Sequence, residues 1–331
     1  MKRILFIGTG GTIASEITEN GLLPGLGPEQ LLKYVPGLEN LCSVDFLQLY
    51  DLDSTNIGPD HWLGMAKTIR ENYALYDGFV ISHGTDTMAY TAAALTYLIQ
   101  YSPKPIILTG AQKPIGFDTT DSKVNLADSF TAACWDGMHG VAVVFNGRVI
   151  AGTRASKTHS KSFDAFSSMN YPNLADVRDG RMLQYIVPEF LPGPLFYDKL
   201  CPSVGLLKLT PGGDVGLMEY MINRYDALIV ESFGVGGLPQ TGGFHDLVRR
   251  AAEEEGKTII MTTQVPNEGS DLAVYNTGFA LAGSGRILEA YDMTTEAVLA
   301  KVMWILGQTR NSDEIRRLFY TPVSRDILSM K

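Results

Sequence analysis

The sequence predicts an α/β fold with a larger amino-terminal domain, built on a doubly wound parallel sheet, and a smaller carboxyl-terminal α/β domain. Short apolar runs rich in β-branched residues alternate with helix-like segments, as in parallel sheets covered on both faces. A proline-rich stretch, residues 179–202, separates two such alternations. We therefore expect domains at residues 1–190 and 204–331, joined by a linker at 191–203.

In the first half, each expected strand ends at a glycine or at a polar turn. These strands are Ile4–Ile7, Phe46–Leu49, Phe79–Ile81, Ile106–Leu108 and Val141–Phe145. Helical spacing of apolar residues, or abundant alanine and leucine, predicts the helices between them. They are Asp60–Tyr76, Asp86–Tyr101 and Ser122–Trp135.

The second half repeats this alternation after the proline-rich stretch. Strands are expected at Val204–Leu209, Ala227–Val230 and Thr258–Met261. Helices are expected at Asp214–Tyr225, His245–Glu255, Thr294–Gly307 and Ser312–Phe319.

Composition excludes several classes of function. The net charge is −9 and no basic stripe is present, which excludes nucleic acid as a direct ligand. No polybasic or amphipathic segment indicates a membrane surface, and no signal sequence or spanning segment is apparent. The cysteines, Cys42, Cys134 and Cys201, are odd in number and form no CxxC, so we expect neither a disulfide framework nor a zinc site. We expect a cytoplasmic protein.

Polar segments follow the predicted strands, where parallel sheets bind their ligands. In Gly8–Ser15, Ile13 replaces the third glycine of a dinucleotide fingerprint, so a nicotinamide site is disfavoured. Two interpretations of this glycine turn remain. Either it presents Thr12 to a ligand, or Thr12 caps the helix that follows. In Asp53–Asn56, short polar residues taken alone indicate a turn.

Two further segments carry more reactive groups. In Ser82–Ala89, Thr85 or Asp86 would suffice as a helix cap, but the segment is richer in polar groups than a cap requires. An aspartate at a helix start could hold an ammonium group, and the backbone N–H groups there could hold an anion. Lys157, within Gly152–His159, is a candidate base if it is partly buried among polar groups.

Taken in order along the chain, these segments resemble the bacterial and archaeal L-asparaginase (asparaginase/glutaminase) family. The matching segments are Gly10–Ser15, Asp53-Ser54, His83–Thr87, Thr109–Gln112 and Ser156-Lys157. Three others, Phe163–Phe166, Gly234–Gly237 and Asp292–Thr294, resemble its cytoplasmic, type I branch. The resemblance covers essentially the whole chain.

The resemblance implies hydrolysis of L-asparagine to L-aspartate and ammonia, without a metal or other cofactor. It also implies a homotetramer of two intimate dimers, with a homodimer as the alternative. Each active site would lie between the first domain of one subunit and the second domain of its neighbour. Preference for asparagine over glutamine stays open, because one methylene changes binding by only about 1–3 kcal/mol.

The resemblance also assigns residues. Thr12 would be the nucleophile that forms a β-aspartyl ester, and Lys157 would draw a proton through Thr85 while Asp86 orients the lysine. Which of Thr12 and Thr85 attacks first stays open. The implied substrate-binding residues are Gly11, Ser54, Thr55, Gly84, Thr85, Asp86 and Ala111. Among them, Ser54 would bind the α-carboxylate, Asp86 the α-ammonium and the Ala111 carbonyl the leaving amide.

One departure from the family pattern concerns the lid. Leu22 stands where family members commonly carry a tyrosine that closes over the substrate. Without a hydroxyl, its side chain cannot make the tyrosine–threonine hydrogen bond, which puts turnover but not the reaction class in question. The acid contributed by a neighbouring protomer is not identified, and Asp292 is one candidate.

Alternative functions remain open. A non-catalytic binding protein for small amino acids would use Ser54 and Asp86 but would need neither Thr12 nor Lys157. An asparaginase-like subunit of a tRNA-dependent amidotransferase would carry an extra amino-terminal domain, and the start of this chain at the first strand counts against it. A nicotinamide oxidoreductase is disfavoured by Ile13.

Overall fold

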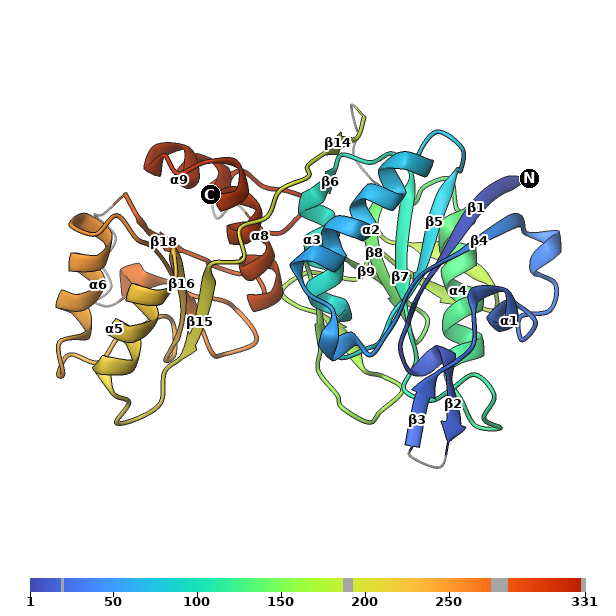
Figure 1. The fold of residues 1–331 in the computed structure, drawn as a ribbon, viewed down its shortest axis with the longest axis horizontal. Coiled ribbons are helices and arrows are strands. Elements are labelled where there is room, and N and C mark those ends of the chain that lie inside the picture. The colour runs from blue at the N-terminus through green and yellow to red at the C-terminus, as the bar shows by residue number, and fades with distance from the viewer. Residues whose placement is uncertain (19–20, 187–192, 275–284, 329–331) are drawn as a thin grey trace. The chain divides into compact units, whose positions relative to one another are not determined.

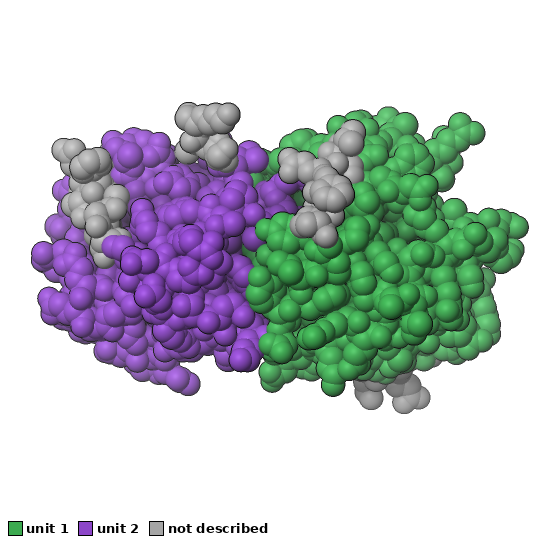
Figure 2. Space-filling model, turned by 90° about the horizontal axis from the view of Figure 1, so that it is seen from above, with its two compact units in different colours: residues 1–198 green, residues 199–331 purple. Residues whose placement is uncertain are grey.

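The computed structural model describes residues 1–18, 21–186, 193–274 and 285–328. The chain divides into two compact units, residues 1–198 and 199–331 (Figure 2). Each unit contains its own sheet (Figure 1). The domain boundary expected near residue 190 falls within 187–192, outside the described residues.

The first unit is built on an eight-stranded sheet with the order β13-β12-β9-β8-β7-β5-β1-β4. Neighbours from β8 to β4 are parallel, whereas β9, β12 and β13 add an antiparallel edge. The strands are β1 (Lys2–Gly10), β4 (Cys42–Leu52), β5 (Gly78–Ser82), β7 (Pro105–Thr109), β8 (Gly140–Phe145), β9 (Arg148–Ala151), β12 (Ala175–Arg178) and β13 (Arg181–Gln184). This arrangement confirms the predicted larger α/β domain on a parallel sheet, to which the antiparallel edge is an unpredicted addition.

Helices cover both faces of this sheet (Figure 1). On one face lie α1 (Pro28–Leu32) and α4 (Ser122–Cys134), and on the other lie α2 (Pro59–Asn72) and α3 (Met88–Leu98). Phe6 of β1 meets Phe130 of α4 edge-on in the apolar layer beneath α4. The helix expected at 86–101 is shorter at both ends, since α3 spans Met88–Leu98 with Thr87 as its N-cap and the next two residues form a short strand. Thr85 and Asp86 bind Lys157 and do not cap the helix.

Among the described residues of the first unit, three pairs of short strands lie outside the main sheet. They are β2 (Ser15–Thr18) with β3 (Gly21–Pro24), β6 (Ile99–Gln100) with β14 (Leu195–Phe196), and β10 (Ala155–Lys157) with β11 (Phe166–Ser168). The linker expected at 191–203 contains β14, which is hydrogen-bonded to β6 of the first unit. Residues 191–192 of that linker lie outside the described residues. Strands this short carry too few side chains for a sequence period to reveal them.

The second unit has a parallel four-stranded sheet in the order β15-β16-β17-β18, which confirms the smaller α/β domain. Helices α5 and α6 pack on one face, and α8 packs on the other with α9 beside it (Figure 1). The strands are β15 (Val204–Lys208), β16 (Ala227–Ser232), β17 (Thr258–Thr263) and β18 (Ile287–Glu289). The helices are α5 (Val215–Arg224), α6 (Phe244–Glu253), α8 (Thr295–Gln308) and α9 (Ser312–Tyr320).

Two properties of the described residues bear on partners and cofactors. No helix there is both long and apolar enough to cross a membrane. Nor do histidine, cysteine, aspartate and glutamate side chains gather there in threes or more around a position for a metal ion.

Candidate active site

Loops that follow four neighbouring parallel strands meet at the carboxyl edge of the large sheet. In the order β7-β5-β1-β4, they contribute Ala111, Gly84, Gly11 and Ser54. The backbones are so close that a Cβ on Gly11 would lie 2.4 Å from the Gly84 nitrogen, and a Cβ on Gly84 would lie 2.6 Å from Ser54 Oγ. Glycine is therefore required at both positions for the loops to converge.

The turn after β1 presents Thr12 without using its side chain as a cap. Gly11, at φ 82°, is the N-cap of a short 3₁₀ helix, Thr12–Ala14, and Thr12 is the first residue of that helix. The capping alternative for Thr12 is therefore wrong. The Gly11 N–H donates to Leu52 O at 3.1 Å, so it is already engaged and is not the donor that this turn would offer to a substrate.

Lys157, Thr85 and Asp86 form one polar cluster. Lys157 Nζ donates to Thr85 Oγ1 at 2.8 Å and lies 2.6 Å from Asp86 Oδ1. The lysine side chain is 15% exposed and the aspartate side chain 60% exposed, so the cation is largely enclosed while its counterion faces solvent. The structure thus brings together three of the predicted groups, although 72 residues separate Thr85 from Lys157.

Ser54 and Thr55 lie in a 3₁₀ turn, Ser54–Asn56, after β4. Ser54 is buried against Gly84, and its carbonyl accepts a hydrogen bond from Thr87 Oγ1 at 2.6 Å. Thr55 is exposed, and its hydroxyl donates to Asp53 Oδ1 at 2.8 Å. The turn predicted for this segment is present, and it places Ser54 beside the loop that carries Thr85.

The loop after β7 is held from α4. Asn125 Nδ2 donates to Gly110 O at 3.0 Å, and the Asp121 carboxylate accepts from the backbone N–H of Gln112 at 2.9 Å. The Gln112 side chain accepts a hydrogen bond from Thr85 Oγ1 at 3.2 Å, while Ala111 is buried. Sequence reasoning missed Gln112, although the matching segment Thr109–Gln112 ends on it.

His83 holds the backbone at Gly84 in place through buried hydrogen bonds. Its Nδ1 donates to Gly84 O at 2.7 Å, its Nε2 accepts from Thr91 Oγ1 at 2.9 Å, and Trp62 Nε1 donates to Thr91 Oγ1 at 2.9 Å. Complete burial lowers the pKa of His83 to about 4. The ring is therefore neutral near pH 7 and serves as a structural hydrogen-bonding group.

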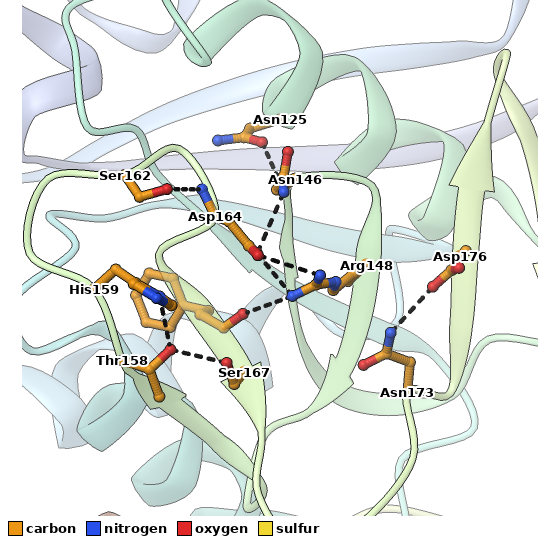
Figure 3. A network of polar contacts seen from close by, with 11 residues as sticks. Asn125, Asn146, Arg148, Thr158, His159, Ser162, Asp164, Ser167, Asn173 and Asp176 are labelled. Carbon is orange, nitrogen blue, oxygen red and sulfur yellow. Dashed lines mark hydrogen bonds and ion pairs between the residues drawn. The ribbon is translucent and has the colours of Figure 1, made fainter.

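A second polar network holds the hairpin that carries Lys157 (Figure 3). The Asp164 carboxylate binds Arg148 at 2.7 Å and accepts from Asn146 Nδ2 at 3.3 Å. The Asn146 N–H in turn donates to Asn125 Oδ1 at 2.9 Å. Asn125 also donates to Gly110 O, so it connects the network around Asp164 to the loop after β7.

Leu22, expected at the lid, and Asp292, the candidate acid of a neighbouring protomer, also lie in the described residues. Leu22 belongs to β3, where it pairs with Ile17. Asp292 lies in the second unit, and its Oδ1 accepts a hydrogen bond from the Leu328 N–H at 3.0 Å.

Comparison with known protein families covers nearly the whole chain. Residues 3–187 match the "Asparaginase, N-terminal" model, and residues 203–319 match the "Glutaminase/Asparaginase C-terminal domain" model. The chain belongs to the asparaginase family. This membership agrees with the resemblance drawn from the strand-end segments.

Individual asparaginase-family relatives are similar over most or all of their length. An L-asparaginase of Thermococcus kodakarensis is 37% identical over 98% of this chain and 99% of its own. The solved structure of the thermostable L-asparaginase from that organism has a TM-score of 0.92, with 99% of this chain and 100% of that one covered. A glutamyl-tRNA(Gln) amidotransferase component of Pyrococcus horikoshii is 32% identical over 98% of this chain and 76% of its own.

Proposed function

We propose that this protein is an L-asparagine amidohydrolase that uses a threonine nucleophile. The observation that carries the proposal is the cluster in which Lys157 Nζ lies 2.8 Å from Thr85 Oγ1 and 2.6 Å from Asp86 Oδ1. A threonine hydroxyl is a poor nucleophile near neutral pH and needs a base or a polarising network, which this cluster supplies. A protein that only binds amino acids would need no such cluster.

The proposed reaction has two steps. Thr12 Oγ1 adds to the side-chain carbonyl carbon of asparagine, the amide C–N bond breaks, and a β-aspartyl ester forms. The proton of the attacking hydroxyl passes through Thr85 and Lys157 to the leaving nitrogen, which departs as ammonia. Water then adds to the ester, aspartate leaves, and a proton returns to the threonine oxygen.

Substrate placement follows from the converging loops. Ser54 binds the α-carboxylate beside Gly84, with Thr55 next to it, and Asp86 binds the α-ammonium. The Ala111 carbonyl accepts a hydrogen bond from the leaving amide. The N–H groups of Thr12 and of the Gly84–Thr85 turn stabilise the oxyanion, each contributing about 10²–10³ in rate. The site requires no cofactor. We place the enzyme in the cytoplasm as a homotetramer or a homodimer.

Ammonia release from asparagine tests the proposal directly. We expect turnover by the unmodified chain, and losses of several orders of magnitude in kcat for Thr12→Ala, Thr85→Val and Lys157→Met with an unchanged circular-dichroism spectrum. Lys161→Met is the matched control, because Lys161 is an exposed lysine in the same hairpin loop. Retained asparagine binding without ammonia release by the unmodified chain would make the protein an amino-acid binder instead.

Acid-quenched mass spectrometry identifies the attacking group. A mass increase corresponding to an aspartyl group on the peptide that contains Thr12 is expected, whereas the same adduct on the Thr85 peptide would reverse the assignment. Thr12→Ala serves as the negative control, since it removes the oxygen that would carry the ester.

A second candidate function is ammonia supply to tRNA-dependent amidation. The similarity to the glutamyl-tRNA(Gln) amidotransferase component favours it, at 32% identity over 76% of that relative. The two candidates differ in what they would require, because a hydrolase would act on asparagine alone, whereas a component of an amidotransferase would need a partner and tRNA. High kcat/KM on asparagine by the chain alone supports the hydrolase, and activity that appears only with a partner protein and tRNA supports the second candidate.

A further inference from the structure

Gln112 touches the hydroxyl of Thr85, and its own orientation follows from its partners. Gln112 Nε2 lies 3.1 Å from the carbonyl oxygen of Ser162, and Gln112 Oε1 lies 3.2 Å from Thr85 Oγ1. A backbone carbonyl can only accept a hydrogen bond, so the amide nitrogen must face Ser162. The amide oxygen therefore faces Thr85, and it can only accept.

The direction of the Thr85 hydroxyl follows in turn. Lys157 Nζ lies 2.8 Å from Thr85 Oγ1, and a protonated lysine can only donate. The Thr85 oxygen therefore accepts from Lys157, and its proton points toward Gln112 Oε1. One lone pair of Thr85 Oγ1 remains for the substrate or for an attacking hydroxyl.

We infer that Gln112 is a positioning residue that holds the Thr85 proton away from Lys157 and thereby favours the protonated lysine. This inference rests on the proposed function, because it concerns the same proton path. For Thr85 to pass its proton to Lys157, the lysine must be neutral and the hydroxyl must turn from Gln112 toward Nζ. Gln112 thus sets how readily the resting site enters the proton-accepting state.

The surroundings of Gln112 and Lys157 hold both side chains in place. The backbone N–H of Gln112 is bound by Asp121, and the hairpin that carries Lys157 is bound through Asp164 to Arg148. Titratable or charged groups also lie within the β10–β11 hairpin and on the elements packed against it. They are Asp86 before α3, Tyr90 and Tyr97 on α3, Arg148 on β9, and His159, Lys161 and Asp164 between β10 and β11. In the described structure, the charged group that contacts Lys157 Nζ is the Asp86 carboxylate, and every variant proposed below retains Asp86.

Substitutions at Gln112 should move the acid limb of the pH–rate profile in opposite directions. Gln112→Met removes the acceptor, so the protonated state loses its advantage and the limb moves to lower pH by about half to one unit. Gln112→Glu places a carboxylate beside the Thr85–Lys157 pair, so the limb moves to higher pH by at least as much. A residue that only supports the fold would change kcat or stability without opposite shifts.

The experiment measures two quantities on the full-length protein. One is kcat/KM on asparagine from pH 5 to 10, and the other is the titration of Lys157 by ¹³C NMR of its Cε, assigned with Lys157→Met. Gln184→Met is the control, because Gln184 also uses its amide as donor and acceptor, to Ile186 O and from Trp135, but lies on β13. If Gln112→Glu fails to fold, Gln112→Met and the control suffice for the comparison.

Opposite shifts in the NMR titration support the inference even if no ammonia is released, in which case only the proposed function fails. Coincident titrations for Gln112→Met and the unmodified protein overturn the inference, even if the unmodified protein hydrolyses asparagine.

Discussion

His83 illustrates how one buried side chain makes stability depend on pH. Burial lowers its pKa to about 4, whereas the unfolded chain binds that proton near the ordinary histidine pKa of 6.5. Between these values the unfolded state holds more protons, so stability is complete above pH 6.5 and falls as the pH is lowered toward 4. We expect His83 to account for about 2 kcal/mol of the loss between pH 7.5 and 5.

Urea unfolding at the two pH values measures this contribution. His83→Gln should be less stable at pH 7.5, because a well-placed hydrogen-bond network is disturbed, but it should lose less on acidification. His139→Gln is the control, since that ring binds Pro103 O near the surface. An equal acid loss for His83→Gln and the unmodified protein would show that His83 is not the titrating group.

Asp128 makes stability depend on pH in the opposite direction. It lies on the buried face of α4, and burial raises its pKa to about 6. The folded state then holds a proton between about pH 4 and 6 that the unfolded state has lost, so stability falls as the pH rises through this range. Asp128→Asn should raise the free energy of unfolding at pH 7.5 by up to about 3 kcal/mol and change it little at pH 4.

Thermal or urea unfolding of Asp128→Asn beside Asp136→Asn provides the comparison. Asp136 is 96% exposed and pairs with Lys2, so its substitution should leave stability nearly unchanged at both pH values. A stability gain for Asp128→Asn that is equally large at pH 4 would mean that packing, and not charge, is responsible.

At the scale of elements, α8 anchors the carboxyl-terminal segment through a buried ion pair. Lys301 Nζ lies 2.6 Å from Asp326 Oδ2, both side chains are 0% exposed, and the lysine also donates to Thr321 O. Burial lowers the pKa of Lys301, and Asp326 partly offsets this effect. Removing one partner leaves an uncompensated charge, so Asp326→Ala should cost about 3–5 kcal/mol.

The double variant Lys301→Met/Asp326→Leu separates charge from packing. Replacing a buried pair by apolar residues of similar volume is often close to neutral, so the double variant should recover most of the lost stability. Differential scanning calorimetry of both variants decides the matter. Recovery is expected, and a double variant no more stable than Asp326→Ala would mean that the segment is held by other contacts.

The elements also show what a sequence can and cannot predict. The buried strands β5, β7 and β8 were predictable because continuous apolar runs ending in glycine or polar residues mark them. The antiparallel edge β9, β12 and β13 was missed because each strand has four residues, too few to display a period. Lys157 was predictable only as a candidate, because its contact with Thr85 is created by the folding of the β10–β11 hairpin.

The limit of sequence reasoning at Gln112 is of another kind. Gln112 ends the family-like segment Thr109–Gln112, but a glutamine carries no charge that would single it out. Its role depends on facing Thr85 on one side and Ser162 on the other, which only the folded arrangement reveals.

At the scale of the whole molecule, we expect that a single chain does not complete the site. In the described Lys157–Thr85–Asp86 cluster the acidic group is Asp86, which already pairs with Lys157 at 2.6 Å. A bound substrate would add an ammonium to the same carboxylate. We therefore expect a second copy of the chain to supply a further polar group, as the family resemblance implies.

Dilution tests this expectation. Specific activity on asparagine should be constant while the protein is oligomeric and should fall when analytical ultracentrifugation shows dissociation to single chains. Adding Lys157→Met chains at that dilution should restore activity, because they supply an intact second unit although their own cluster is disabled. A double variant that also carries Thr12→Ala should rescue equally well, since the rescuing chain contributes only its second unit. Undiminished specific activity of dissociated single chains would show that one chain forms a complete site.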